Sequence, residues 1–368
     1  MPNLEDYITQ QLAAKKPFVV YRKPNSEKVK VVMQQNSVVH KVNDYTETGF
    51  IFSPFDASSP SILIKQDEVY ETVYDVSSFD RKESKNIKDS SISQKGDYLN
   101  LIQKSINTIK NSEIQKIVVS REIKVNFSQR PYNFFQHLLC LYPNAFCYLW
   151  YHPKIGMWSG ATPEVLAHVE NNRIITNSLA GTQLADGDEI PSWGNKELDE
   201  QKIVTNFIVD ALKGKVADLN ISETTSIRAG ALWHLRTRIS GKMKNNFKEI
   251  IKALHPTPAT CGMPKDATKK FILESEGYNR LYYTGFLGEL NMKQETNRTS
   301  SGRNQENRAY KIIKKSSFLY VNLRCIQLKE KTALIYVGGG ITQDSVPEKE
   351  WDETVSKSAT MLAAITNN

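Results

Sequence analysis

Strand-like runs follow one another along much of this chain without helices between them. Residues 165–182 contain two runs of alternating apolar residues around Asn171–Asn172, a pattern typical of a β-hairpin. Further strand-like runs lie at 282–292, 317–328 and 332–341. Parallel strands need a long crossover, usually a helix, whereas antiparallel strands need only a turn. The sequence therefore predicts an α+β fold with a mainly antiparallel sheet and helices packed outside it.

Helical spacing of apolar residues occurs in separate segments of the chain. It predicts helices over residues 3–15, 98–111, 196–214 and 347–365. Gly214 is a stop signal for the third of these helices. Before the last helix, Ser345 and Glu348 match the S-x-x-E capping box, which predicts that Ser345 caps its N-terminus.

Two of the predicted helices carry acidic pairs three residues apart near their start. Glu197 and Glu200 form one pair, and Glu350 and Glu353 form the other. Residues at this spacing share a helix face, so each helix offers two carboxylates on one side. Across a cleft such pairs would repel unless a hard cation lay between them, and Mg²⁺ suits a site of few carboxylates. Exposed helix faces often carry such pairs, so the spacing alone also fits two solvated helices.

The composition describes a globular chain. Of its residues 40% are hydrophobic and 24% are charged, as in a folded globular protein. Its length of 368 residues is enough for one large domain or two ordinary ones. No run of 18 apolar residues is present, and the N-terminus lacks a signal-peptide pattern. The four cysteines are scattered and form no C-x-x-C pair. We therefore expect a soluble cytoplasmic protein without a membrane partner, a disulfide framework or a zinc site.

The positive charge is concentrated in one segment. Residues 293–315 carry five of the eight net positive charges and few aromatic residues. A basic segment can bind nucleic acid, but without aromatic residues for bases to stack on, a solvated loop is the better interpretation. We therefore predict a flexible basic loop at about 293–316 and no nucleic-acid partner. A nucleic-acid binder that uses this loop is the non-enzyme alternative.

Seven motifs then occur in order between Lys116 and the C-terminus. They are KIVVSRE (116–122), SGATPEVL (159–166), SLAGT (178–182), KELDEQKIV (196–204), HPTPATCGMP (255–264), NLRCIQL (322–328) and GGGITQDSVPEKEWDET (338–354). The series, in about two-thirds of the chain, resembles that of the chorismate-utilising enzymes, which include anthranilate, aminodeoxychorismate, isochorismate and salicylate synthases. The resemblance implies a single catalytic domain over 1–368, in which two large antiparallel sheets pack face to face with helices outside. Residues 1–100 would complete the sheets.

The resemblance also implies a metal site. Glu200 and Glu353 match the family's Mg²⁺ ligands, with Glu197 and Glu350 close by as supporting groups. Many family members have His after the first ligand, whereas this chain has Gln201. Lys357, one turn after Glu353, resembles a family residue near the metal-bound carboxylate of chorismate.

Two further positions match the family's acid and base. Lys116 occupies the position of the lysine that activates water, although by itself it would be interpreted as an exposed lysine at the start of a strand. A lysine acts as a base only when its pKa falls well below about 10.4. Glu164 matches the general acid that protonates the departing hydroxyl, which requires a raised carboxyl pKa.

The remaining matches concern the substrate chorismate. Arg324 would hold the enolpyruvyl carboxylate and Tyr283 would contact the pyruvyl group, while glycine lets the main chain approach the ligand. The other expected substrate-binding positions are Gly338, Gly339, Gly340, Ala180, Thr182, Ala259 and His255, the last of them as a structural or substrate-adjacent residue.

The choice within the family rests on a few positions. Ala180 stands where aminodeoxychorismate synthases have a nucleophilic lysine, and Lys116 stands where anthranilate synthases have Gln. Ala259 favours isochorismate synthase, while Tyr283 and Leu323 leave salicylate synthase as the alternative. We therefore expect a Mg²⁺-dependent isochorismate synthase, a monomer without a glutamine amidotransferase subunit. Menaquinone synthesis and catechol siderophores both use isochorismate, and the sequence leaves both open.

Overall fold

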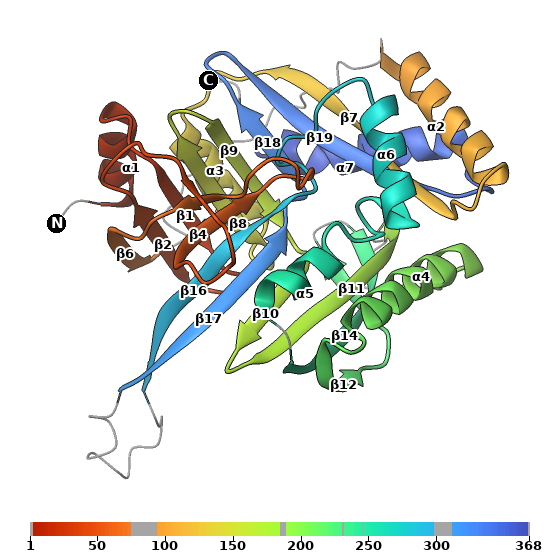
Figure 1. The fold of residues 1–368 in the computed structure, drawn as a ribbon. Coiled ribbons are helices and arrows are strands. Elements are labelled where there is room, and N and C mark those ends of the chain that lie inside the picture. The colour runs from red at the N-terminus through yellow and green to blue at the C-terminus, as the bar shows by residue number, and fades with distance from the viewer. Residues whose placement is uncertain are drawn as a thin grey trace.

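The computed structural model describes residues 3–74, 94–184, 189–229, 232–244, 246–297 and 311–366. Two large antiparallel sheets dominate this part of the chain (Figure 1). The first has nine strands, in the order β15 (Gly262–Met263), β7 (Lys116–Asn126), β19 (Thr332–Ile341), β18 (Cys325–Leu328), β9 (Gly156–Thr162), β8 (Phe146–His152), β1 (Phe18–Arg22), β2 (Lys28–Met33) and β6 (Glu68–Val73). The second runs β12 (Val216–Ile221), β14 (Leu232–Met243), β11 (Arg173–Leu184), β10 (Val165–Glu170), β17 (Lys311–Val321), β16 (Phe286–Asn297), β4 (Gly49–Ser53), β5 (Ile62–Ile64) and β3 (His40–Lys41), with β13 (Thr225–Ala229) paired to β14.

Aromatic side chains fill the space between the two sheets. Trp150 on β8 and Trp158 on β9 are fully buried and lie beside Phe52 of the opposite sheet, with ring centroids 4.9 and 6.0 Å away. Phe146 on β8 stacks on Tyr320 of β17 at 4.2 Å. Large rings suit this position because each strand turns every second side chain inward, where two sheet faces interdigitate. The face-to-face α+β arrangement expected from the sequence is confirmed.

Helices cover the outer faces of both sheets. Helices α1 (Leu4–Ala13) and α3 (Pro131–Leu141) bury apolar side chains against the first sheet, and α4 (Asn195–Leu212) and α5 (Phe247–Leu254) do so against the second. Helices α2 (Lys95–Lys110) and α6 (Lys265–Ser275) pack against β7, and α7 (Pro347–Leu362) packs against the neighbouring β19 and against α2. The two helices that carry the acidic pairs, α4 and α7, start at the same end of the sandwich (Figure 1).

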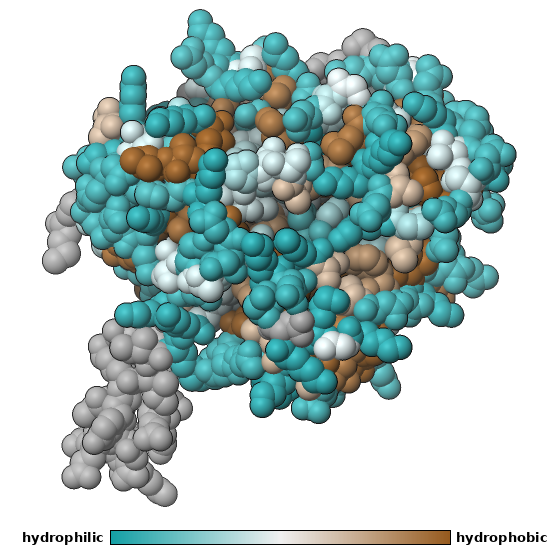
Figure 2. Space-filling view, viewed as in Figure 1, coloured by the Kyte–Doolittle hydropathy of each residue, from teal (hydrophilic) through white to brown (hydrophobic). Residues whose placement is uncertain are grey.

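The face shown in Figure 2 is mostly hydrophilic, with scattered apolar patches. Among the described helices, none combines the length and the apolar character needed to cross a membrane.

Residues 317–328, predicted as one strand, belong to two strands in different sheets. β17 ends at Val321 in the second sheet, and β18 begins at Cys325 in the first. Between them Arg324 adopts a left-handed backbone with φ 48°. Apolar alternation cannot reveal this crossing, because both halves satisfy the same period. The crossing places Leu323 and Arg324 where the two sheets meet.

Two other local expectations need correction. The predicted loop at 293–316 is shorter, since β16 continues to Asn297 and β17 starts at Lys311, while 298–310 lies outside the described residues. Ser345 does not cap α7: its N-cap is Val346, whose side chain makes no capping bond, and Pro347 opens the helix. The Ser345 hydroxyl instead accepts a hydrogen bond from the backbone N–H of Thr342 at 3.1 Å, which closes the turn before the helix.

Gly288 lies where β16 is paired closely with β17. Its φ is +147°, and a Cβ atom there would lie 1.9 Å from the carbonyl oxygen of Phe318. Gly288→Ala should therefore lower the free energy of unfolding by at least about 3 kcal/mol, because backbone strain and a clash with main chain add together. Urea denaturation would measure this loss.

Gly214→Ala is the matched control. Gly214 also has a positive φ, +77°, but no atom lies within 4 Å of an added Cβ. Only the conformational cost of about 1 kcal/mol should appear. Equal losses in the two variants would contradict the role assigned to Gly288.

Candidate functional site

A cavity opens where the two sheets meet near the starts of α4 and α7. Its empty volume is about 1040 Å³, part of it open to solvent. Strands β7, β11, β14 and β19 and helices α4 and α7 contribute to its wall, together with the segment between β9 and β10 and the turns that precede β15, β16 and β18. The expected site residues that line it are Glu164, Ala180, Thr182, Glu197, Glu200, Ala259, Tyr283, Arg324, Gly338, Gly339, Gly340, Glu353 and Lys357.

Lys116 is buried beside the cavity. Its side chain is 1% exposed, and its Nζ donates to Glu200 Oε1 at 2.6 Å. Burial alone would raise the pKa of Glu200, but the charge of Lys116 and its hydrogen bond, with Lys357 and Lys196 behind them, hold that pKa below its usual value. The interpretation of Lys116 as an exposed surface lysine is therefore wrong.

The glycine triplet makes room for this contact. Gly340 lies opposite Val118 in the β7–β19 ladder, and a Cβ atom on it would be 2.7 Å from the Lys116 Cε and 3.3 Å from Glu200 Oε1. A Cβ on Gly339 would lie 3.5 Å from Glu350 Oε2. Gly339 and Gly340, which belong to a strand, therefore leave space for charged side chains.

Helix α7 adds two carboxylates to the same region. Glu353 contacts Lys357 Nζ at 2.5 Å, and Glu350 Oε1 accepts from Lys196 at 3.2 Å. Glu350 is 2% exposed, and its Oε2 is buried without a hydrogen-bond partner among the described residues. Burial, together with the neighbouring charge of Glu353, raises the pKa of Glu350.

These carboxylates suit a hard cation. Within the described ranges no three carboxylates, imidazoles or thiolates converge closely enough to hold a metal by themselves. Mg²⁺ commonly takes only one or two carboxylates and completes its shell with water and substrate oxygens, so this arrangement fits it. The unpartnered Oε2 of Glu350 supports that fit, because a buried carboxylate oxygen without a donor is costly. Lys116 and Lys357 neutralise Glu200 and Glu353 in the metal-free chain.

Glu164 lies at the strand junction between β9 and β10, close to the positive charges of Lys116, Arg324 and Lys357. It is 6% exposed, and burial raises the pKa of its carboxyl to about 7, against the lowering effect of Lys116, Arg324 and Lys357. A carboxyl with this pKa is protonated in a large fraction of molecules near neutral pH. It can therefore donate a proton.

Arg324 and Tyr283 form another wall. The Nη1 of Arg324 donates to the carbonyl oxygen of Lys357 at 3.3 Å, and its other donors make no hydrogen bond within the described residues. A guanidinium has five N–H donors, so most of this fork can receive a carboxylate. The ring of Tyr283 stacks on Tyr336 at 5.4 Å, which fixes the aromatic face beside the cavity.

Some expected residues have other roles. His255 does not line the cavity; its ring packs edge-on against Phe286 at 5.0 Å, and its Nε2 lies 3.3 Å from the Pro54 carbonyl. Gln201 points away from the acidic group and donates to Ser178 Oγ at 2.6 Å, which holds α4 on the sheet. Glu197 accepts from the backbone N–H of Gly194 at 3.1 Å and so caps α4 while lining the cavity.

His234 on β14 also lines the cavity and was missed from the sequence. Its Nδ1 lies 3.0 Å from the Gly181 carbonyl and 3.3 Å from Thr182 Oγ1. Burial, with the charge of Arg324, lowers its pKa to about 4, so the ring is neutral at physiological pH. Its alternation partners Arg236 and Arg238 are exposed, and strand period therefore predicts an exposed position. No pattern in this strand marks His234 as different.

Family models and curated relatives match much of this chain. Residues 38–299 and 314–363 match two models described as chorismate binding enzyme. Isochorismate synthase DhbC of Bacillus subtilis is 29% identical over 218 residues, 56% of this chain and 50% of that protein. Isochorismate synthase EntC of Escherichia coli K12 is 26% identical over 328 residues, 84% of this chain and 78% of that protein. The match to DhbC thus spans only about half of that relative's length.

A solved structure shares the fold. The menaquinone-specific isochorismate synthase MenF from Escherichia coli superposes with a TM-score of 0.72 at 18% identity, covering 95% of this chain and 88% of that one. Residues of the ordered motifs line the cavity, and the two family models cover most of the chain. This chain therefore belongs to the family of chorismate-binding enzymes.

Proposed function

We propose that the protein is an isochorismate synthase that converts chorismate to isochorismate with the help of Mg²⁺. The observation that carries the proposal is a buried lysine beside the cavity together with a protonatable carboxyl that lines it. Lys116 lies on β7, and Glu164, whose pKa is about 7, feels its charge from the other side. The similarity to proteins named isochorismate synthase supports the same activity.

In the proposed reaction water adds to C2 of chorismate, the ring double bonds shift, and the C4 hydroxyl leaves. Lys116 takes a proton from the water, and Glu164 gives a proton to the departing oxygen. One water enters and one leaves, so substrate and product are isomers. The two residues then exchange protons with solvent to return to their starting states.

Lys116 must give up a proton before it can act as a base, because an ammonium group has no free lone pair. A neutral amine could still donate an N–H to Glu200, whose Oε1 lies 2.6 Å away, and accept a proton from water. Bound Mg²⁺ would supply positive charge to the carboxylate of Glu200 and to the ring carboxylate of chorismate. Glu200 and Glu353 would hold it, with Glu350 and Glu197 nearby.

The substrate's second carboxylate would lie against Arg324. Its guanidinium fork is half-buried in the cavity wall and suits a carboxylate geometrically. Neutral His234 can donate or accept one hydrogen bond without adding charge. Ala180 and Ala259 contribute small apolar side chains to the wall, so position 180 offers no lysine to attack the ring.

Incubation with chorismate and Mg²⁺, followed by chromatography of the products, tests the function. Isochorismate should form, and EDTA should abolish turnover because the ring carboxylate loses its cation. Anthranilate formed from added ammonium, without a hydroxylated product, would overturn the proposal. Salicylate with pyruvate would instead support the alternative, salicylate synthase, to which Tyr283 and Leu323 point.

Lys116→Gln tests the base. The variant should still bind chorismate in calorimetry, while kcat should fall by about 10²- to 10⁴-fold, the usual contribution of a general base. Lys124→Gln is the control, since Lys124 is exposed on the same strand and should leave kcat unchanged. A Lys116→Gln enzyme with a near-normal rate would show that another group activates water.

Glu164→Gln tests the raised pKa through stability. A carboxyl whose pKa rises from 4.5 to about 7 on folding holds its proton more tightly in the folded protein. Its contribution to the free energy of unfolding therefore declines as pH rises between those values and stays low above them. Glu164→Gln should remove this loss and be more stable than wild type at pH 8 by up to about 3 kcal/mol.

Urea denaturation between pH 5 and pH 8 measures the difference, which should grow with pH. Glu223→Gln, at an exposed glutamate away from the cavity, is the control and should follow the wild-type profile. A constant difference between Glu164→Gln and wild type would show that the carboxyl has an ordinary pKa.

A further inference from the structure

Strand β7 carries Lys116 but lacks a full partner strand at one edge. β15 pairs with it only at Gly262–Ile117 and Met263–Lys116. The backbone N–H of Val118 still finds the Cys261 carbonyl at 2.8 Å, after which no strand continues this edge in the described structure. Buried backbone groups need partners, so the carbonyl of Val118 and the N–H of Ser120 must be satisfied in another way.

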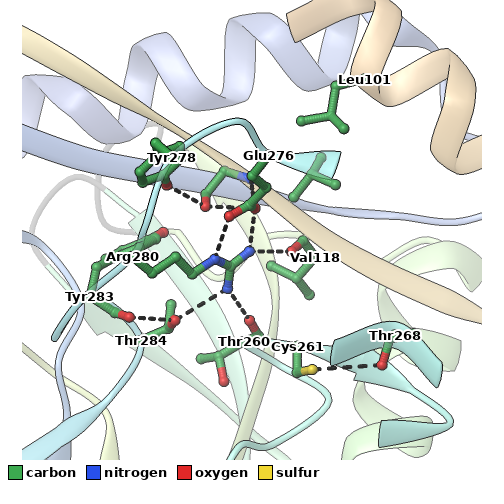
Figure 3. A network of polar contacts seen from close by, with 12 residues as sticks. Leu101, Val118, Thr260, Cys261, Thr268, Glu276, Tyr278, Arg280, Tyr283 and Thr284 are labelled. Atoms are coloured by element: carbon green, nitrogen blue, oxygen red, sulfur yellow. Dashed lines mark hydrogen bonds and ion pairs between the residues drawn. The ribbon is translucent and has the colours of Figure 1, made fainter. Parts of the chain in front are cut away.

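Two charged side chains take the place of the missing strand. Arg280 Nη2 donates to the Val118 carbonyl at 2.7 Å, and Glu276 Oε1 accepts from the Ser120 N–H at 2.7 Å and from its hydroxyl at 2.8 Å (Figure 3). Arg280 Nε also donates to Glu276 Oε2 at 2.7 Å. The pair therefore continues the hydrogen-bond pattern of the sheet beyond β15.

The pair is almost completely removed from water. The side chains of Arg280 and Glu276 are 2% and 1% exposed, and the guanidinium lies 4.6 Å from the ring centroid of Phe55. Replacement of a buried ion pair by apolar residues is often neutral or stabilising, so burial alone does not explain why charges are present. Here each charge also satisfies backbone groups that an apolar side chain would leave unpaired.

The same guanidinium reaches the wall of the cavity. Its Nη1 donates to the Thr260 carbonyl at 2.9 Å and to Thr284 Oγ1 at 3.2 Å, and Thr284 Oγ1 donates to the Tyr283 carbonyl at 2.6 Å (Figure 3). Val118, Thr260, Tyr283 and Thr284 all line the cavity. One planar group thus fixes three chain segments that come from distant parts of the sequence.

We propose that Glu276 and Arg280 are positioning residues that hold β7, and with it Lys116, in register with the Thr260 and Tyr283 wall of the site. Side chains 116, 118 and 120 alternate onto one face of β7. Glu276 and Arg280, here called the clamp, therefore fix the backbone of β7 at Val118 and Ser120, beginning two residues after the buried lysine. The kinetic consequence rests on the proposed function, whereas the structural consequence does not.

Glu276→Gln and Arg280→Lys test the clamp. Each keeps a polar side chain of similar length, but Glu276→Gln loses the negative charge and Arg280→Lys loses the guanidinium fork. Deuterium exchange in peptides spanning 116–122 and 257–263 should become at least about 10-fold faster, because the strand edge opens locally. With chorismate and Mg²⁺, kcat/KM should fall by about 100-fold in folded enzyme, the usual effect of displacing a reacting group by about 1 Å.

Glu289→Gln is the matched control. Glu289 is equally buried and contacts Lys23 at 2.6 Å and Lys30 at 3.2 Å, but it does not line the cavity. It should lower the melting temperature without faster exchange at 116–122 and without a change in kcat/KM per folded molecule. Faster exchange at 116–122 in this control as well would refute a local clamp.

The exchange and kinetic results separate the possible failures. Unchanged exchange in both clamp variants overturns the inference, and faster exchange with unchanged kcat/KM overturns the positioning role. A wild-type protein without isochorismate synthase activity refutes the proposed function, and exchange alone then decides the clamp. If neither clamp variant folds, the wild type still decides it: exchange at 116–122 as fast as in edge strand β6 would overturn it.

Discussion

Contacts between lysines and glutamates hold the two sheets together at the cavity. Lys116 comes from the first sheet, whereas Glu200 comes from the helix that covers the second, and their contact at 2.6 Å joins the two layers. Lys196 on α4 and Glu350 on α7 make a second contact of this kind at 3.2 Å, while Lys357 pairs with Glu353 within α7. Without these lysines the carboxylates would repel one another in a partly buried space. The same charges that stabilise the closed arrangement are those that the proposed chemistry has to rearrange.

The general architecture could be predicted because it depends on local patterns. Direct succession of alternating runs requires antiparallel pairing, and hairpins such as the one at 165–182 have sequence signals of their own. The acid pairs at 197/200 and 350/353 follow from helical spacing. The expected residues that line the cavity were predicted from the ordered motifs and not from any period, since Glu164 alone could equally be a polar residue at a strand junction.

Other features depend on contacts between distant segments and leave no local signal. The crossing at 322–324 divides a run whose apolar period is continuous, and only the presence of two sheets shows where it must break. His234 is buried because a cavity wall lies over it, although its strand alternation predicts exposure. Ser345 matches a capping motif, but the turn that it closes competes for its hydroxyl. In each case tertiary context overrides a local preference.

The passage of the chain from β17 to β18 makes Arg324 mechanically unusual. Its backbone connects the two sheets directly, so a molecule bound to its guanidinium is coupled to both sheets. Ligand binding to the native state adds to its stability by mass action. Because Arg324 lies between the two sheets and not within one of them, ligand binding in the cavity should stabilise the packing of one sheet against the other.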